Sequence, residues 1–365
     1  MRLTKCSYFV FKWFLVLMTV SFVLTCYFRS NSDVLPKSSR RLITRNITLF
    51  AATSFFSETL GASSLRMCSE EVKNSCTLTS DPKKLPEADA IVFHSSNVHH
   101  DTEGKYNALR KPGVPFVVMT MENPDFSELR NFYNWTMNCR MSSDVPMPYG
   151  AVEKLERRVE VDYEQIWNSK RKTAVWLVSN VHTTQNRRKD LTEKMVEKGM
   201  DIDLLGQAYK EPVECPKFGG DPKCLEKLFK PYKFAIAFEN TNSEDYVTEK
   251  FWYRLKMLQV VPIVMTRVIY RNLGIPDSMY IAVDDFPTLK ELVDHVKRVS
   301  ADKNAYLEYH TWREEYRILD ANEGNYGFCL LCRKLVNLSE NPLKSYDTVN
   351  YKITTDYNEV ANRYL

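Results

Sequence analysis

The strongest constraint on the fold is a set of short, unbroken apolar runs that recurs along both halves of the 365-residue chain. The runs do not alternate with polar residues, which is typical of parallel strands buried on both faces. In the first half they cover 47–51, 90–94 and 115–122. In the second half they cover 172–179, 201–206, 234–238, 260–264 and 279–283. We therefore expect two mainly parallel β-sheets.

Helical patterns between these runs complete an α/β plan. Residues 185–198 have helical spacing and end at Gly199, a suitable C-cap. Further helices are expected over 248–257 and 288–299. Two α/β halves imply a cleft between them, lined by the carboxyl ends of strands.

A long apolar segment near the N-terminus predicts a membrane anchor. Tyr8–Phe28 spans about 21 residues, and a helix of that length is about 30 Å long, the thickness of a bilayer core. Positive charges in the preceding segment favour a cytoplasmic N-terminus. A cleaved signal peptide is the alternative. The anchor interpretation predicts a single-pass type II membrane protein whose remaining chain lies in the lumen.

These patterns divide the chain into six predicted parts. They are a cytoplasmic tail (1–7), an anchor (8–28), a stalk (29–45), an N-terminal domain (46–165), a C-terminal domain (166–335) and a C-terminal tail (336–365). The boundary between the domains follows from the polar, basic stretch 165–171.

A lumenal location makes further predictions. Asn46, Asn134 and Asn337 each begin an N-glycosylation triplet. Close cysteines are read as disulfides in an oxidising compartment, so the local guesses are Cys68–Cys76, Cys215–Cys224 and Cys329–Cys332. Spacing does not fix this connectivity, and Cys139 is left over. The Cys329-x-x-Cys332 pair has no partner ligands at zinc spacing nearby, so no metal site is expected.

Composition excludes some classes of function. The formal net charge is only +4, from 50 basic and 46 acidic residues, which argues against a nucleic-acid partner. The sequence contains no P-loop and no GxGxxG pattern.

Two polar clusters follow strands of the second half. Glu239 and Asn240 end one strand, and Thr248 then caps a helix that begins with Glu249 and Lys250. A helix N-terminus and a lysine favour phosphate, whereas the carboxylates can accept hydrogen bonds from sugar hydroxyls. The second cluster places Ser179 and Asn180 at a strand end before Arg187, Arg188 and Lys189, and arginine forks match diphosphate oxygens. A plain helix cap and a solvated basic helix face are the alternatives.

A third group lies in the first half. Glu122 follows a predicted strand and precedes Asn123 and Pro124. Sugar transfer to a hydroxyl needs a base on the attacking oxygen, and this is commonly Glu or Asp. A solvated loop carboxylate is the alternative.

These segments, in this order, resemble the α1,3/4-fucosyltransferase family. The resemblance rests on Phe234–Asn240 leading into Asp245-Tyr-Val-Thr-Glu-Lys250, with further matches at Trp176–Asn180 and Pro148-Tyr-Gly150. It covers roughly residues 45 to 335. It implies a GT-B fold of two Rossmann-like domains, GDP-β-L-fucose as the donor and inversion at the anomeric carbon.

The resemblance also implies roles for individual residues. Glu122 falls where the family keeps its general base. Arg187 matches a phosphate-facing arginine, with Arg188 one residue away. Lys250 would hold the diphosphate, while Asn240, Tyr246 and Glu249 would surround ribose and fucose. Glu239, Ser179 and Asn180 complete the predicted donor site.

The expected activity is α1,3-transfer of fucose to the 3-hydroxyl of GlcNAc on a glycan, at the Golgi membrane. Cationic side chains would let the enzyme work without an essential metal, although Mn²⁺ or Mg²⁺ can raise the rate. The acceptor stays open between core and antennal GlcNAc, and a homodimer is one option for the oligomeric state. A GT-B transferase with another nucleotide sugar and a non-catalytic lumenal glycan-binding protein are the alternatives.

Overall fold

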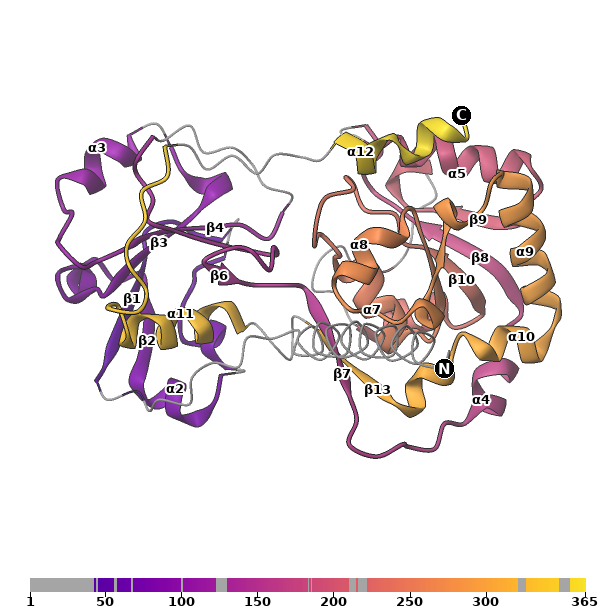
Figure 1. Cartoon of the computed structure of the whole chain (residues 1–365), viewed down its shortest axis with the longest axis horizontal. Coiled ribbons are helices and arrows are strands. Elements are labelled where there is room, and N and C mark those ends of the chain that lie inside the picture. The colour runs from indigo at the N-terminus through magenta and orange to yellow at the C-terminus, as the bar shows by residue number, and fades with distance from the viewer. Residues whose placement is uncertain are drawn as a thin grey trace, which may run out of the picture. The chain divides into compact units, whose positions relative to one another are not determined.

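The computed structural model describes most of the chain after residue 42 (Figure 1). The described ranges are 43, 45–55, 58–66, 68–99, 101–122, 130–182, 184, 186–209, 215, 222–320, 326–347 and 355–365. Within them, no helix is both long and apolar enough to cross a membrane. The predicted tail, the 8–28 anchor and most of the stalk lie outside the described residues.

The first sheet has six parallel strands in the order β2-β1-β3-β4-β5-β6. Their bounds are β1 Ile47–Ala51, β2 Cys76–Thr79, β3 Ala90–His94, β4 Phe116–Met119, β5 Trp135–Asn138 and β6 Val145–Pro146. Helices α2 (Glu70–Ser75) and α3 (Thr102–Asn107) lie between strands. The three strands predicted in this half are confirmed, and β2, β5 and β6 are additional.

The second sheet has five parallel strands in the order β12-β11-β10-β8-β9. The strands are β8 Lys172–Leu177, β9 Ile202–Leu205, β10 Tyr232–Ile236, β11 Val261–Val264 and β12 Ile281–Ala282. The helices are α4 Tyr163–Asn168, α5 Arg188–Glu197, α6 Pro222–Phe229, α7 Glu249–Met257, α8 Arg267–Asn272, α9 Leu289–Ala301 and α10 Lys303–Glu308. All five strands and three helices predicted for this half are present.

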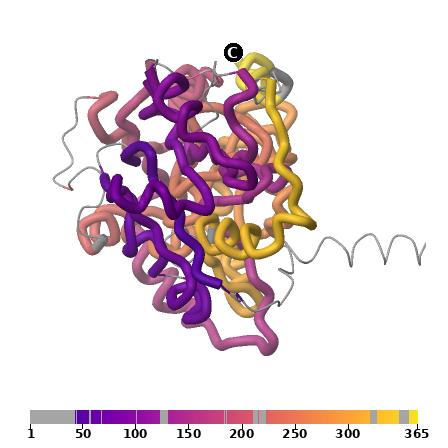
Figure 2. Tube along the Cα trace, turned by 90° about the vertical axis from the view of Figure 1, so that its left-hand side faces the viewer, coloured from indigo at the N-terminus to yellow at the C-terminus, as the bar shows by residue number. Residues whose placement is uncertain are grey.

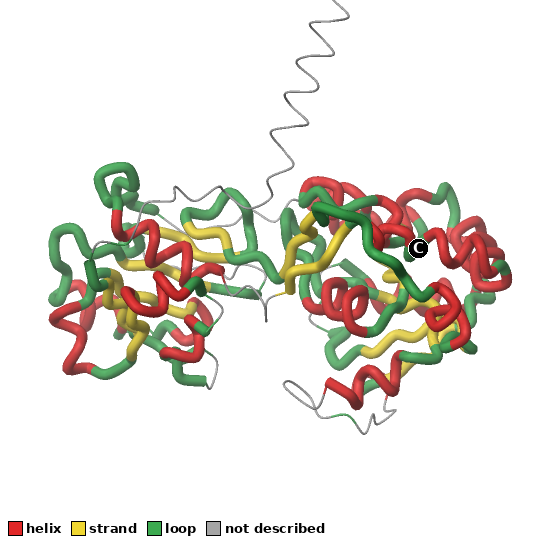
Figure 3. Tube along the Cα trace, turned by 90° about the horizontal axis from the view of Figure 1, so that it is seen from below, coloured by secondary structure: helices red, strands yellow, loops and turns green. Residues whose placement is uncertain are grey.

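Helices cover both faces of the second sheet (Figure 3). On one face, Trp176 and Phe234 pack with Leu191 of α5 and Val293 of α9. On the other face, the core contains side chains of α6 and α7. Burial on both faces explains why these strands are unbroken apolar runs.

Two short strands, one after each parallel sheet in the sequence, form a separate antiparallel pair. Strand β7 (Gly150–Lys154) comes soon after β6, and it pairs with β13 (Tyr316–Asp320), with Ile318 opposite Val152. Neither strand was predicted, since both carry many charged or polar residues.

Helix α11 (Tyr326–Val336) returns to the first sheet. Phe328, Leu331 and Leu335 lie in the same core cluster as Leu49 and Val117 of strands β1 and β4. The predicted boundary assigned this helix to the C-terminal domain, so the structure places a late part of the chain with the N-terminal sheet.

The packing of α11 on the first sheet determines two of the three disulfides. The bonds are Cys68–Cys329, Cys76–Cys332 and Cys215–Cys224. The Cys215–Cys224 prediction is confirmed, whereas Cys68–Cys76 and Cys329–Cys332 are wrong as pairs. Spacing of three residues puts Cys329 and Cys332 on one face of α11. That face packs into the core of the first sheet, which also contains Cys68 before α2 and Cys76 at the start of β2. Among the described cysteines, only Cys139 is a free thiol, and it is buried.

The two long-range disulfides should share their stabilising effect. When the Cys68–Cys329 bond is intact, it already joins the two distant segments. The additional loop that Cys76–Cys332 closes then consists only of residues 68–76 and 329–332. We therefore expect Cys76→Ala/Cys332→Ala to lower the free energy of unfolding by about 3 kcal/mol, the value for a small closed loop. Urea unfolding measures this difference. An unchanged unfolding midpoint would contradict the expectation.

The described residues of the predicted C-terminal tail pack on both parallel sheets. Near residue 346 the chain lies on the first sheet, where the Tyr346 hydroxyl donates to buried Asp144 (2.6 Å) and Lys344 forms an ion pair with the same carboxylate (2.6 Å). Helix α12 (Thr355–Asn358) and the following turn end the chain, with Val360 and Ala361 in the core of the second sheet. Figure 2 shows this last part in yellow.

Two basic residues, buried Lys170 and partly buried Arg313, cap the C-terminal end of α7. Lys170 donates to the Leu258 carbonyl (3.4 Å) and the Arg313 guanidinium donates to the Leu255 carbonyl (2.6 Å). Burial lowers the pKa of Lys170 to about 7, and the nearby positive charge of Arg313 acts in the same direction.

This lowered pKa predicts a pH-dependent effect of Lys170→Met. In the unfolded chain the lysine titrates near its usual pKa of about 10.4, so between pH 9 and 6 the unfolded state binds more protons and acid destabilises the wild type. Methionine does not titrate. We therefore expect the free energy of unfolding of Lys170→Met, relative to that of the wild type, to rise by roughly 2–3 kcal/mol on going from pH 9 to 6. Urea unfolding at both pH values checks this, and a pH-independent difference would contradict it.

Candidate active site

The candidate site is built on the irregular loop that connects β10 to α7. The loop runs over 237–248, and Thr248 is the N-cap of α7, since its side chain accepts a hydrogen bond from the Lys250 backbone N–H (3.3 Å). A helix N-terminus has unpaired N–H groups and a partial positive charge. This end of α7 therefore favours an anionic ligand.

Glu239 fixes the start of α7 from within the protein. Its carboxylate accepts hydrogen bonds from the Thr248 backbone N–H (2.8 Å) and the Thr248 hydroxyl (2.7 Å). The side chain is only 4% exposed, and burial raises the pKa of Glu239. Both oxygens thus have internal partners, so a direct contact of Glu239 with a sugar stays a prediction.

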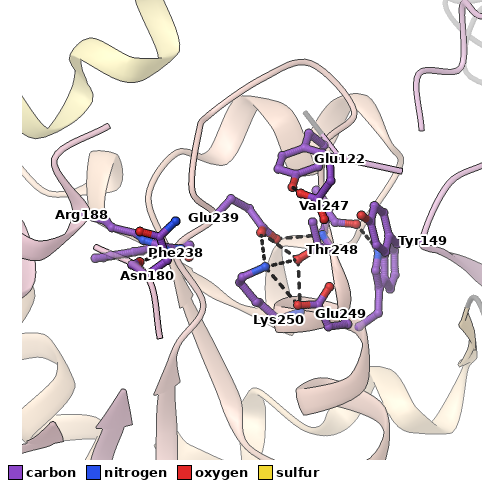
Figure 4. Close-up of polar contacts among 12 residues, drawn as sticks. Glu122, Tyr149, Asn180, Arg188, Phe238, Glu239, Val247, Thr248, Glu249 and Lys250 are labelled. Atoms are coloured by element: carbon purple, nitrogen blue, oxygen red, sulfur yellow. Dashed lines mark hydrogen bonds and ion pairs between the residues drawn. The ribbon is translucent and has the colours of Figure 1, made fainter. Parts of the chain in front are cut away.

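Lys250 lies at the centre of the polar cluster (Figure 4). Its ammonium contacts Glu239 (3.3 Å), Glu249 (3.0 Å) and the Thr248 hydroxyl (2.9 Å). Burial opposes the charged form, but the two carboxylates outweigh this effect and raise the pKa of Lys250. The Lys250 side chain is 25% exposed, so the protein covers it only in part.

The loop also brings Tyr246 to Glu122. Glu122 follows β4 of the first sheet, and the Tyr246 hydroxyl donates to its Oε2 (3.2 Å). Tyr246 is buried, and burial raises the pKa of its hydroxyl, which therefore stays a donor. Residues predicted in separate halves of the chain are thus in contact, and the predicted base lies beside the predicted donor loop.

The two adjacent arginines have different environments. Arg187 is half-exposed and binds the carboxylate of Asp190 (2.9 Å) and the amide oxygen of Asn362 (3.1 Å). Arg188 is buried, and its guanidinium donates to the carbonyls of Phe238 (2.9 Å) and Asn180. Arg188 therefore lies where β8 and β10 end, whereas Arg187 is engaged at the surface.

The remaining predicted donor residues lie at the same strand ends. Ser179 and Asn180 follow β8 and are exposed, and the Asn180 side chain accepts a hydrogen bond from the His182 backbone N–H (3.1 Å). Glu249 is 63% exposed beside Lys250.

Several buried polar atoms around the loop lack a partner within the described part of the chain. They are Asn186 Oδ1, Arg188 Nε, Asn240 Oδ1 and Ser243 Oγ. Buried polar groups are normally hydrogen-bonded, so these atoms indicate a site for a polar ligand or water. The described residues contain no cluster of three or more His, Cys, Asp or Glu side chains arranged for a metal ion.

Two family profiles match successive parts of the chain. "Fucosyltransferase, N-terminal" matches 44–150, and "Glycosyltransferase family 10 (fucosyltransferase) C-term" matches 167–352. The chain belongs to the glycosyltransferase family 10 fucosyltransferases. The N-terminal match contains Glu122, and the C-terminal match contains the loop with Tyr246 and Lys250. Residues 355–365 lie beyond both matches.

Curated fucosyltransferases are similar over most of their length. The chain is 50% identical over 327 residues to α-(1,3)-fucosyltransferase fut-5 of Caenorhabditis elegans, covering 87% of this chain and 86% of the relative. It is 40% identical over 333 residues to fut-6 of the same organism, covering 88% and 84%. Among solved structures, an α1,3-fucosyltransferase with GDP-fucose matches with a TM-score of 0.52 and 15% identity, covering 84% of this chain and 96% of that one. This likeness supports the fold of two parallel α/β sheets.

Sequence reasoning missed one residue in the site of this fucosyltransferase. The Tyr149 hydroxyl donates to the carbonyl of Met121, next to Glu122, and its ring lies edge-on to Tyr246 (6.2 Å between centroids). Its neighbour Gly150 has no room for a side chain, because a Cβ there would lie 2.5 Å from the Trp252 ring. The Pro148-Tyr-Gly150 segment resembled the family in sequence, but this match did not indicate a role for Tyr149 in the site.

The three predicted glycosylation sites of this fucosyltransferase have different surroundings. Asn46 is exposed before β1. Asn134 is partly buried, and its amide nitrogen donates to the Lys344 carbonyl (2.9 Å). Asn337 is partly buried, and its side-chain oxygen accepts from Ser339 (3.1 Å). Glycosylation at each position stays a prediction.

Proposed function

We propose that this protein is an inverting α1,3-fucosyltransferase that moves fucose from GDP-β-L-fucose to the 3-hydroxyl of GlcNAc in a glycan. The observation that supports this most strongly is the hydrogen bond between Glu122 and Tyr246 (3.2 Å). It brings a carboxylate of the first sheet to the loop that carries Lys250 and begins α7.

The proposed reaction is a single displacement. Glu122 accepts the proton of the acceptor hydroxyl as that oxygen forms a bond to C1 of fucose. The bond between C1 and the phosphate oxygen breaks, and negative charge develops on GDP. Lys250 and the N-terminus of α7 stabilise this charge where it appears. Tyr246 holds the Glu122 carboxylate toward the donor loop.

A second cation is proposed at the ends of β8 and β10. Arg187 was the predicted phosphate contact, but its guanidinium is engaged by Asp190 and Asn362 at the surface. Arg188 is buried beside Phe238, with an unpartnered Nε among the described residues. We therefore favour Arg188 as the arginine that acts on the diphosphate side, either directly or by holding the strand ends.

Transfer to a defined glycan panel tests this function. The lumenal part is incubated with GDP-fucose and GlcNAc-containing acceptors, and product linkage is read by mass spectrometry and NMR. Competition by GDP but not UDP is expected, and a preference for UDP would favour a transferase with another nucleotide sugar. Binding of GDP without turnover on any acceptor would favour the glycan-binding alternative.

The proposed location is the Golgi membrane, with the catalytic part in the lumen. The apolar Tyr8–Phe28 segment supports this, and so does the presence of three disulfides in the described residues, because disulfides persist in oxidising compartments. Protease protection in intact vesicles, with the lumenal part resistant and the N-terminus cleaved, tests the proposal.

A further inference from the structure

The irregular loop of the donor site needs support from outside the loop itself. Residues 237–248 contain no helix or strand, and Asp245 has a positive φ of 60°, which is uncommon for a residue with a side chain. Glu239 holds one end through Thr248. In the middle, the buried Asn186 amide donates to the Glu239 carbonyl (2.9 Å) and to Asn242 Oδ1 (3.2 Å).

The other support of the loop comes from the end of the chain. The Asn242 backbone N–H donates to Asn358 Oδ1 (2.7 Å), and the Asn242 amide donates to the Tyr357 carbonyl (2.8 Å). The Asn358 amide donates to the hydroxyl of Thr241 (3.3 Å). Asn242 is only 3% exposed, so water is a poor substitute for these partners.

The segment that carries Asn358 is itself well anchored. Val360 and Ala361 are buried in the core of the second sheet. At the far end, the Tyr364 hydroxyl donates to the carbonyls of Val283 (3.0 Å) and Phe286 (2.7 Å). The burial of Val360 and Ala361 fixes the chain next to Asn358 independently of the loop, whereas the Tyr364 hydroxyl holds only the far end of the segment.

Asn240 and Ser243, the residues on either side of Thr241 and Asn242, each have a side-chain oxygen without a hydrogen-bond partner among the described residues. Both atoms, Asn240 Oδ1 and Ser243 Oγ, are buried. Thr241 and Asn242, which lie between them, are the residues that Asn358 and Tyr357 hold. A shift of this pair would move both unsatisfied groups together.

We infer that Asn358 is a positioning residue of the donor site, and that Tyr357 and Asn358 belong to this site. Asn358 acts through Thr241 and Asn242 to place Asn240 and Ser243 toward the nucleotide sugar. This inference rests on the proposed function for the identity of the ligand. It assigns two residues of the predicted C-terminal tail, Tyr357 and Asn358, to donor binding.

The test compares Asn358→Ala with Tyr364→Phe. Asn358→Ala leaves the buried Asn242 N–H without its acceptor, and we expect about a tenfold rise in both the KM for GDP-fucose and the Kd for GDP. The KM for the acceptor should stay within twofold. Tyr364→Phe removes hydrogen bonds of the same segment away from the loop, so it should lower the melting temperature with unchanged donor constants.

Hydrogen exchange gives a second readout that needs no activity. Peptides covering 239–248 should exchange faster in Asn358→Ala than in wild type, and not in Tyr364→Phe. The inference is overturned by unchanged exchange together with donor constants within twofold of wild type, or by equal effects of the two variants. Wild-type protein that neither binds GDP nor uses GDP-fucose would overturn the proposed function instead, while the exchange result would still report whether Asn358 holds the loop.

Discussion

Glu122→Gln is expected to lower kcat for fucosyl transfer on the order of 10³-fold, the typical contribution of a general base. The amide cannot accept the proton of the attacking hydroxyl. Its carbonyl oxygen can still accept the hydrogen bond that Tyr246 now donates to the carboxylate (3.2 Å). The local structure should therefore persist, and calorimetry should give a Kd for GDP within twofold of wild type.

A matched control separates the base from a general effect of charge. Glu308 is an exposed carboxylate at the end of α10, and Glu308→Gln should keep kcat within twofold of wild type. If Glu122→Gln retained more than a tenth of wild-type activity, another group would have to act as the base.

Lys250→Met is expected to reduce kcat/KM for GDP-fucose by roughly 10²- to 10³-fold, because loss of a preorganised charge at the leaving group is costly. A second effect is expected on stability. Glu239 is 4% exposed and 3.3 Å from the lost ammonium, and removing one partner of a buried pair costs about 3–5 kcal/mol. Steady-state kinetics and urea unfolding measure the two effects.

The double variant Lys250→Met/Glu239→Gln separates these roles of Lys250. A neutral glutamine needs no counter-ion and can still accept the hydrogen bond from the Thr248 N–H. Stability should recover in large part, whereas transfer should stay low because the cation is still absent. Recovery of transfer in the double variant would show that Lys250 serves Glu239 rather than the departing GDP.

The sequence best predicts those strands whose burial leaves a clear pattern of apolar residues. The runs at 47–51 and 90–94 match β1 and β3 residue for residue, since strands covered on both faces must be apolar throughout. Strand β2 (Cys76–Thr79) alternates buried and more exposed residues over only four positions, and β7 carries Glu153, which pairs with Arg317 at the surface. Such short, mixed segments give no signal above that of a loop.

Contacts between distant segments were beyond local reasoning. The cysteines were recognised, but their pairing depends on where α11 packs, and nothing within 326–336 indicates the first sheet as its partner. In the site, Glu122, Tyr246 and Lys250 were named from motifs. The engagement of Arg187 with Asp190 and Asn362, and the support of Asn242 by Asn358, depend on side-chain directions and on a chain end without a motif.

The return of α11 also sets an order of events during biosynthesis. Cys68 and Cys76 are made early, yet their partners follow 261 and 256 residues later. At about 5–20 residues per second, the ribosome needs roughly a quarter of a minute to a minute to supply them. The whole second sheet is synthesised in that interval, while both early thiols still lack their native partners. In the proposed lumenal location, native pairing would therefore depend on oxidoreductases that keep Cys68 and Cys76 from pairing with each other until α11 emerges.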